Sequence, residues 1–359
     1  MNPSEIRQEN LQVSPLADDL DSVLIQTQGL WDGLRGKRLF ITGGTGFFGS
    51  LLLESFLSAN TRFDLGASAV ILTRNSDAFR RKAPHLASHP CLRFHQGDIQ
   101  DFTFPEGEFS HIIHAAATSA VDSFNNIAPL VTFDIITRGT RRVLEFAIKC
   151  KAQDMLFTSS GAVYGRQPSD MSHIPENYPG APDSTDARYF LSESKRSAEM
   201  LCALHAKQFG IKIRIARCFS FVGPYLPLDV HYAVGNFIRD ALAGGPVQVR
   251  GDGAPHRSYL YTSDLLVWLW TILFKGESCR AYNVGSEEDM TIADVARRVG
   301  QSFAQPVDVT IASAPIPGKL IDRYVPSTQR VQKELGLKQS VDFRTAIDRT
   351  IAYHRSLGR

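Results

Sequence analysis

The chain of 359 residues is long enough for two domains or one large one, and its 39 Lys and Arg residues nearly balance its 37 Asp and Glu residues. The formal net charge of +2 gives no indication of a nucleic-acid or membrane-surface partner. Five scattered cysteines, without Cys-x-x-Cys pairs or neighbouring histidine clusters, predict reduced thiols, a cytoplasmic protein and no metal site. The longest apolar run, residues 265–274, is too short to cross a bilayer and predicts a buried helix.

Residues 1–36 precede the first predicted strand, and their apolar positions predict short helices that lie on the main domain. From Leu39 onward, apolar runs alternate with helical periodicity, which predicts an α/β fold with a doubly wound parallel sheet over residues 37–220. Residues 221–359 contain shorter, mixed elements, which predict a smaller mixed α/β lobe interleaved with the first. The predicted strands cover residues 39–41, 69–73, a stretch ending at 97–99, 111–114, 155–160 and 211–216, and the main predicted helices cover residues 48–57, 129–150 and 190–209.

A glycine-rich turn joins the first predicted strand to the first helix of this sheet. Gly44, Gly46 and Gly49 satisfy the pattern G-x-G-x-x-G, and Gly43 precedes them. Glycines allow unusual backbone angles and a close approach of the main chain to a pyrophosphate. The helix that follows presents free N–H groups and the positive end of its dipole to such an anion. The turn therefore predicts a dinucleotide site in a Rossmann-type domain.

With these motifs in order, the chain resembles the extended short-chain dehydrogenases/reductases of the nucleotide-sugar epimerase and dehydratase type. The resemblance covers residues 37 to about 355, and its carriers are residues 42–49, Gly97-Asp98, His114-Ala115-Ala116-Ala117, Gly139-Thr140, residues 159–165, residues 194–199, Gly223-Pro224, residues 251–257, Asp264-Leu265 and residues 282–285. It implies transient oxidation of a sugar carbon by a tightly held nicotinamide. The cofactor contacts that it implies are Gly43, Gly46, Phe47, Phe48, Gly49, Arg74, Asp98, Ile99, Ala115, Ala116 and Lys195.

The resemblance implies that Ser160 holds the substrate oxygen and that Lys195 lowers the pKa of a catalytic tyrosine. That tyrosine is expected four residues before the lysine, where this chain has Leu191. Tyr189 can replace it only if the helix begins after Tyr189 and the chain bends back. Tyr164 is a second candidate, although in the family this residue lines the sugar pocket.

Two functions from different classes follow from these residues. The first is a nicotinamide-dependent enzyme that epimerises or reduces a nucleoside-diphosphate sugar; dehydration is disfavoured because Gly161 and Ala162 replace the acidic pair of the dehydratases. The alternative is a catalytically degenerate protein that binds cofactor or nucleotide sugar as a sensor or partner subunit, which Leu191 favours.

The end of the second strand predicts the choice of cofactor. NAD-preferring folds place a carboxylate there, whereas this chain has Thr73-Arg74-Asn75. An arginine fork suits a 2′-phosphate, so the sequence favours NADP, with NAD as the alternative.

On the substrate side, the resemblance implies that Arg257 holds the diphosphate, with Arg323 as a second candidate and Ser220 and Asn236 as further contacts. His231 is expected at the pocket rim and not as a metal ligand. The resemblance also implies a homodimer formed by the helices at 129–150 and 190–209, with contacts from Ile135, Val143, Phe146, Met200 and Leu204.

Overall fold

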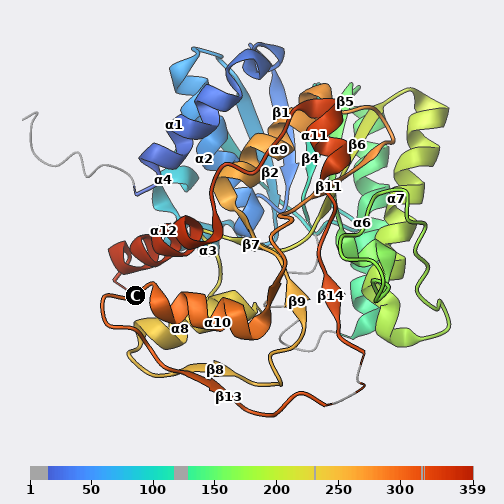
Figure 1. Ribbon diagram of the computed structural model, residues 1–359. Helices are drawn as coiled ribbons and strands as arrows, with labels where there is room; N and C mark the ends of the chain where they lie inside the picture. The colour runs from blue at the N-terminus through green and yellow to red at the C-terminus, as the bar shows by residue number, and fades with distance from the viewer. Residues whose placement is uncertain (1–14, 117–127, 230–231, 317, 319, 359) are drawn as a thin grey trace, which may run out of the picture.

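The computed structural model describes residues 15–116, 128–229, 232–316, 318 and 320–358 (Figure 1). Residues 1–14 of the predicted N-terminal extension, Ala117 of the alanine motif and His231 lie outside the described residues. The rest of the extension forms two short helices, α1 (Ala17–Gln26) and η1 (Gln28–Leu34).

A seven-stranded sheet lies at the centre of the larger part, with strand order β11-β6-β5-β4-β1-β2-β3, and every neighbouring pair is parallel. This confirms the predicted α/β, doubly wound fold. The order reverses between β1 and β4, and ligands of such sheets bind at the carboxyl ends of the strands at this switch point. The strands are β1 (Arg38–Thr42), β2 (Ser68–Thr73), β3 (Leu92–Gln96), β4 (His111–His114), β5 (Asp154–Ser160), β6 (Lys212–Cys218) and β11 (Ala281–Val284).

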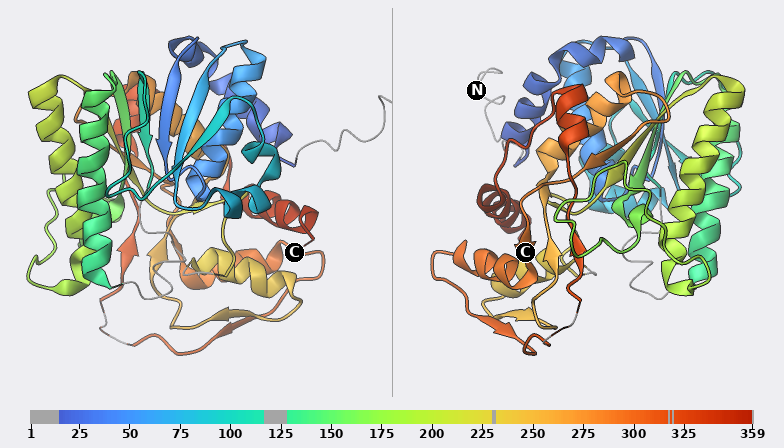
Figure 2. Two further views of the ribbon diagram at one scale, coloured as in Figure 1. Left: turned by 180° about the vertical axis from the view of Figure 1, so that it is seen from behind. Right: turned by 45° about the vertical axis from the view of Figure 1, so that its right-hand side comes forward.

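Helices cover both faces of the sheet because successive side chains of a buried strand point to opposite sides. Leu39 and Ile41 pack into one core, with α1, α2 and α9, whereas Phe40 packs into the other, with α6 and α7. Figures 1 and 2 show α6 and α7 side by side on one flank of the sheet. The helices of this part are α2 (Phe47–Arg62), α3 (Ser76–Lys82), α4 (Pro84–Ala87), α6 (Pro129–Lys149), η2 (Gly161–Tyr164), η3 (Ala187–Tyr189), α7 (Phe190–Phe209), α9 (Thr262–Lys275) and α11 (Gln329–Leu335).

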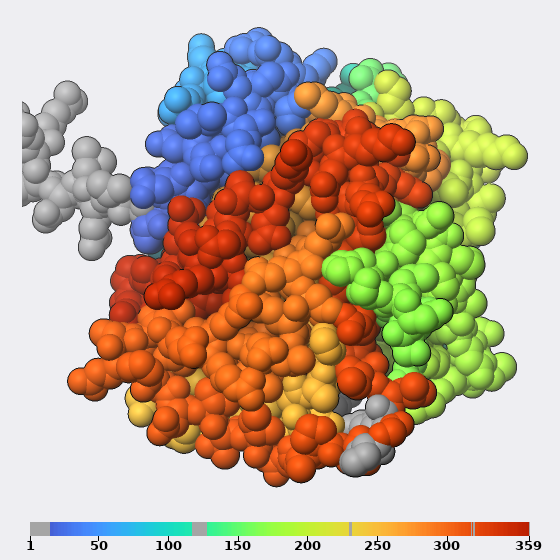
Figure 3. All heavy atoms as spheres, viewed as in Figure 1, coloured from blue at the N-terminus to red at the C-terminus, as the bar shows by residue number. Residues whose placement is uncertain are grey.

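The smaller lobe lies below the carboxyl ends of the sheet in Figure 1 and has its own core, to which α8, α10 and α12 contribute. In Figure 3 the C-terminal residues spread over the front of the molecule and meet the segment after β5. Since β11, α9 and α11 belong to the larger part, residues 221–359 contribute to both. The elements of the lobe are β7 (Phe221–Val222), α8 (Ala233–Leu242), β8 (Val247–Val249), β9 (His256–Arg257), β10 (Leu260–Tyr261), β12 (Met290–Thr291), α10 (Ile292–Gln301), β13 (Val309–Ile311), β14 (Arg323–Tyr324) and α12 (Phe343–Ser356).

Several predicted boundaries were too short or misplaced. The first helix runs to Arg62 and not to residue 57, because its apolar face continues to Ala59. The third strand ends at Gln96, so residues 97–99 follow the strand and form the turn in which Phe102 N–H bonds to Asp98 O. The sixth strand continues to Cys218, which brings its end level with Ser160 on β5.

Candidate active site

The glycine turn after β1 lies at the switch point of the sheet. Gly43 has a φ of +72°, and an added Cβ would lie 2.5 Å from the carbonyl oxygen of Ala115 after β4. An added Cβ at Gly49 would lie 2.1 Å from Gly43 O. These two glycines are therefore required by the packing of the turn itself, without reference to a ligand.

Gly46 differs from its neighbours because a Cβ there would meet only Gly43 O, at 3.3 Å, within 4 Å. Gly46 is also the N-cap of α2 and has no side chain to satisfy the first N–H groups of that 16-residue helix. The open face above Gly46 and the helix end fit a pyrophosphate, which such helix ends bind.

A buried network fastens the ends of β1 and β4 beneath this turn. Thr42 Oγ1 lies 2.7 Å from His114 Nδ1 and accepts from Ala116 N–H at 3.2 Å, and His114 Nε2 lies 3.0 Å from Thr140 Oγ1 on α6. Burial, and to a smaller extent the charge of Lys195, lower the pKa of His114 to about 3. The imidazole is therefore neutral and holds the two strand ends in register. Sequence reasoning quoted these residues only as family motifs and missed the network.

The residues predicted to contact the adenosine half lie at the same edge. Arg74 is exposed directly after β2. The Asp98 carboxylate accepts from Gln100 N–H at 3.0 Å, which orients it after β3. Ile99 packs against Gly139 of α6, where an added Cβ would lie 2.9 Å from Ile99 Cγ1.

Ser160 is the last residue of β5, and the side chain of Lys195 reaches the same strand from α7. Ser160 Oγ accepts from Ala162 N–H at 3.1 Å, which fixes the hydroxyl at the start of η2. Lys195 is 5% exposed; its Nζ donates to Thr158 O at 2.8 Å and lies 4.9 Å from the centre of the Phe157 ring. Burial lowers the pKa of Lys195 to about 8. The ammonium of Lys195 is hydrogen-bonded two residues before Ser160 on β5, and an amine with a lowered pKa near a fixed serine suits proton-transfer chemistry.

The positions considered for a catalytic phenol differ in their surroundings. Leu191 is 38% exposed in the first turn of α7. Tyr189 is the last residue of η3 and the N-cap of α7, and its side chain is half-buried. Tyr164 is 2% exposed, donates its hydroxyl proton to Asn283 Oδ1 at 2.7 Å, and burial raises its pKa to about 12.

A third tyrosine, which sequence reasoning missed as a candidate, lies next to Ser160. The hydroxyl of Tyr324 is 3.3 Å from Ser160 Oγ, although 164 residues separate the two along the chain. Tyr324 lies on β14 of the smaller lobe. In the sequence, Tyr324 is marked only by its position next to Arg323, a candidate for binding the diphosphate.

A small sheet of order β12-β9-β14 places the two predicted phosphate-binding arginines. Tyr324 stands opposite Arg257 in the register, and Arg257 Cζ is 5.9 Å from the Tyr324 ring. Arg323 stands opposite His256, and both of these side chains pair with Asp289. Since neighbouring strand residues point to opposite faces, Arg257 shares a face with Tyr324 and Arg323 lies on the other.

The remaining predicted substrate contacts lie elsewhere in the lobe. Ser220 is half-buried between β6 and β7, and its carbonyl accepts from Leu260 N–H at 3.0 Å. Asn236 lies on α8, where its Oδ1 accepts from Arg239 at 3.2 Å. Arg257 itself pairs with Asp322, with Nη2 2.6 Å from Oδ2.

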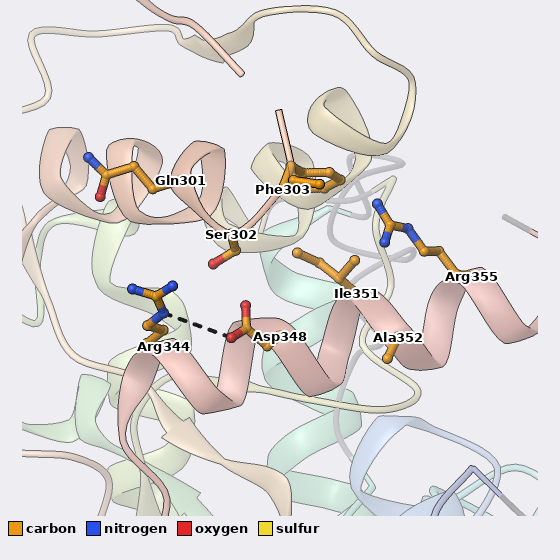
Figure 4. Close-up of a pocket in the computed structure, with 9 residues that line it drawn as sticks. Gln301, Ser302, Phe303, Arg344, Asp348, Ile351, Ala352 and Arg355 are labelled. Carbon is orange, nitrogen blue, oxygen red and sulfur yellow. Dashed lines mark ion pairs between the residues drawn. The ribbon is translucent and has the colours of Figure 1, made fainter. Parts of the chain in front are cut away.

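An open hollow of about 380 Å³ lies away from these residues (Figure 4). It is lined by the end of α10 and by α12, including Ser302, Arg344 and Asp348, and by none of the predicted site residues. Among the described residues, no group of three or more His, Cys, Asp or Glu side chains could hold a metal ion. No helix in the described part of the chain is both long and apolar enough to cross a membrane.

The parallel sheet and the glycine turn at its switch point are those of a Rossmann-type dinucleotide-binding domain. The chain belongs to the NAD dependent epimerase/dehydratase family, which it matches over residues 39–285. This confirms the resemblance described from the sequence.

Individual members of this family are similar to the chain over most of its length. UDP-glucuronic acid decarboxylase 1 of Xenopus tropicalis is 27% identical over 319 residues, which cover 89% of this chain and 72% of the relative. A dTDP-glucose 4,6-dehydratase from Streptomyces venezuelae, solved with NAD, superposes with a TM-score of 0.73 at 24% identity, covering 89% of this chain and 97% of the other. A UDP-glucose 4-epimerase from Thermotoga maritima, solved with UDP-glucose, gives a TM-score of 0.72 at 21% identity, covering 90% and 100%. At these identities the two solved structures show the shared fold.

Proposed function

We propose that the chain binds a nicotinamide dinucleotide along the β1–β4 edge and epimerises or reduces a nucleoside-diphosphate sugar held between the two parts. The observation that most supports this proposal is the open space above Gly46. It lies at the switch point of the sheet, on the same edge as Ser160 and Lys195. The bound dinucleotide supplies or accepts hydride, and Ser160 orients the sugar oxygen. Burial lowers the pKa of Lys195 to about 8, so its amine is still mostly protonated at pH 7 and loses its proton slightly above that pH.

The residues after Ser160 support epimerisation or reduction over dehydration. Water elimination calls for a carboxylate pair, and this chain has Gly161 and Ala162 instead. An added Cβ at Gly161 would lie 2.6 Å from Phe219 Cζ, so the packing leaves no room for an acidic side chain there. Curated relatives decarboxylate UDP-glucuronic acid. A UDP-hexuronic acid therefore belongs in the substrate panel beside UDP-glucose and dTDP-glucose.

We infer NADP as the preferred cofactor, with NAD as the alternative. The support is Arg74, which is exposed directly after β2 where an NAD-preferring fold carries a carboxylate. The family description and the solved dehydratase name NAD, so the two cofactors need direct comparison. Arg74→Ala should weaken NADP binding more than NAD binding in titration calorimetry; equal losses for both would contradict the preference.

A homodimer through α6 and α7 belongs to the same proposal. Leu130, Met200 and Leu204 are 73%, 60% and 53% exposed on these adjacent helices. The prediction that Val143 and Phe146 make dimer contacts is wrong, because both side chains are 0% exposed within a single subunit. Light scattering should give twice the chain mass, and Met200→Glu with Leu204→Glu should give the monomer.

The five free cysteines support a reducing compartment such as the cytoplasm.

The decisive test combines binding with turnover. A ligand that binds only the folded state raises the melting temperature, and one present at about 100 times its Kd adds about 2.7 kcal/mol to the free energy of unfolding. NADP or NAD should raise the melting temperature of the wild type and leave that of Gly46→Val unchanged. Nucleotide sugars are then added to the loaded protein, and nicotinamide absorbance and sugar products are followed. No response to either dinucleotide contradicts the proposal; binding of cofactor and sugar without turnover favours the degenerate binding protein.

A further inference from the structure

Leu191 leaves the site without the tyrosine that the family places next to its lysine. Among the hydrogen bonds of the described residues, the phenol that reaches Ser160 is that of Tyr324, whose hydroxyl is 3.3 Å from Ser160 Oγ. The hydroxyl of Tyr164 is committed to Asn283 instead. The smaller lobe therefore delivers a phenol to the serine that the proposed function assigns to the sugar oxygen.

The Tyr324 side chain is held from three sides. Its ring packs on Phe219 with a centroid separation of 4.6 Å, and its hydroxyl donates a long hydrogen bond to Cys218 O, 3.4 Å away at the end of β6. Arg257 approaches the ring from the neighbouring strand of the small sheet. This support fixes the hydroxyl relative to Ser160, as a group that transfers protons requires.

The backbone order explains why this phenol reaches the site. In the register of β5 and β6, Ser160 stands opposite Cys218. β14 then carries Tyr324 onto both strand ends, with Arg257 on the same face. Ser160 lies at the Tyr324 hydroxyl and Arg257 lies over its ring, so a nucleotide sugar held by both residues would lie beside this phenol.

We propose that Tyr324 is the proton-transfer residue of this site, in place of the tyrosine that Leu191 lacks. This inference rests on the proposed function. When a sugar ketone is reduced, the carbonyl carbon gains a hydride and the carbonyl oxygen gains the Tyr324 hydroxyl proton. The resulting phenolate takes a proton back from water. In the oxidative direction, the phenolate removes the proton of the sugar hydroxyl as hydride leaves the carbon.

The electrostatics of Tyr324 favour the reductive direction. Burial raises the pKa of its hydroxyl to about 12, and the hydrogen bond to Ser160 opposes that shift. The phenol therefore keeps its proton at neutral pH and can donate it without prior ionisation. Oxidation would need a cation near the phenol to stabilise the phenolate, and Arg257 faces its ring.

The test compares Tyr324→Phe with wild type on the nucleotide sugar that the binding panel identifies. Loss of a positioned proton donor lowers turnover on the order of 10²- to 10⁴-fold. Affinities for the dinucleotide and the sugar should change little, because the ring and its packing on Phe219 remain. Tyr178→Phe is the matched control: it removes a phenol hydroxyl from the same apolar cluster and should retain wild-type turnover.

A second measurement separates proton transfer from mere packing. Replacing Tyr324 with a fluorinated tyrosine lowers the phenol pKa and leaves the ring in place. If Tyr324 donates the proton, the alkaline limb of the turnover profile should move to lower pH by the same amount. An unmoved limb, or wild-type turnover in Tyr324→Phe, overturns the assignment.

The outcomes also distinguish this inference from the proposed function. If Gly46→Val binds the dinucleotide as wild type does, the cofactor site is wrong whatever Tyr324 does. If cofactor binding depends on Gly46 but Tyr324→Phe keeps its turnover, only the role of Tyr324 is wrong. The role of Tyr324 is also overturned if the wild type is inactive, or if the variant Leu191→Tyr has a much larger turnover than the wild type.

Discussion

At the cofactor edge of the site nearly every feature is main chain. Gly43, Gly46 and Gly49 shape the turn, α2 offers its first N–H groups, and the strand ends are joined by Thr42 and His114. At the substrate edge the features are side chains from distant segments: Ser160, Arg257 and Tyr324 meet across two lobes, and carboxylates neutralise the arginines. A site built from main chain is readable from a short motif, whereas a site built from the side chains of distant segments is not, because the packing of the two lobes brings those side chains together.

The largest expected effect tests the side-chain edge through a mostly buried ion pair next to it. Arg217 on β6 pairs with Glu199 on α7, with Nη2 2.7 Å from Oε2, and Ser159 Oγ donates to the same carboxylate at 2.6 Å. Arg217→Ala leaves the Glu199 carboxylate, which is 12% exposed, without its partner, and this should lower the free energy of unfolding by up to about 3–5 kcal/mol. Urea unfolding measures this.

Replacing both partners, as in Arg217→Met with Glu199→Leu, is the matched comparison. The double variant should recover most of the loss because no unpaired charge remains. A double variant as unstable as Arg217→Ala would show that packing, and not charge, holds this edge.

The next effect tests the backbone edge. Gly46→Val should weaken dinucleotide binding by about 100-fold or more, equivalent to about 2.8 kcal/mol, because the side chain enters the open face above the turn. Its melting temperature without ligand should stay near wild type, since only Gly43 O lies within 4 Å of the added Cβ.

Gly49→Ala is the contrasting variant at the same turn. Its added Cβ would lie 2.1 Å from Gly43 O, so it should lower the melting temperature of the unliganded protein. Equal melting temperatures for the two variants would remove the distinction between a glycine kept for ligand and one kept for packing.

A third effect concerns pH and the network below the turn. His114 has a folded pKa of about 3 against an ordinary value of 6.5, so the unfolded chain binds a proton that the folded one does not. Stability from this group is present above pH 6.5 and is lost as pH falls towards 3, with a slope of at most about 1.4 kcal/mol per pH unit. His114→Asn should flatten this part of the stability profile in urea titrations; an unchanged slope would exclude His114 as its source.

The smallest effect concerns the ion pair on the substrate edge. Asp322→Asn releases Arg257, and because Asp322 is 54% exposed the change should cost about 0–1 kcal/mol of stability. Affinity for a nucleoside diphosphate should rise, since Arg257 no longer has to leave a carboxylate. Calorimetry with UDP measures it, and Asp348→Asn at the hollow of Figure 4 is the control that should change nothing. Weaker UDP binding in Asp322→Asn would mean that this carboxylate helps to orient Arg257.

Ser160 and Lys195 were singled out through the family resemblance, whereas the sequence by itself determined the strand–turn–helix unit at Gly43–Gly49 and the parallel sheet. These depend on short-range periodicity and on backbone geometry that neighbouring residues specify. Only the tertiary structure decided that Tyr324 lies at Ser160, that Arg257 and Arg323 point to opposite faces, and that Val143 and Phe146 are buried within one subunit. The reason is physical: contacts between residues 164 positions apart, such as Ser160 and Tyr324, are set by how two lobes pack, and no local pattern records that packing.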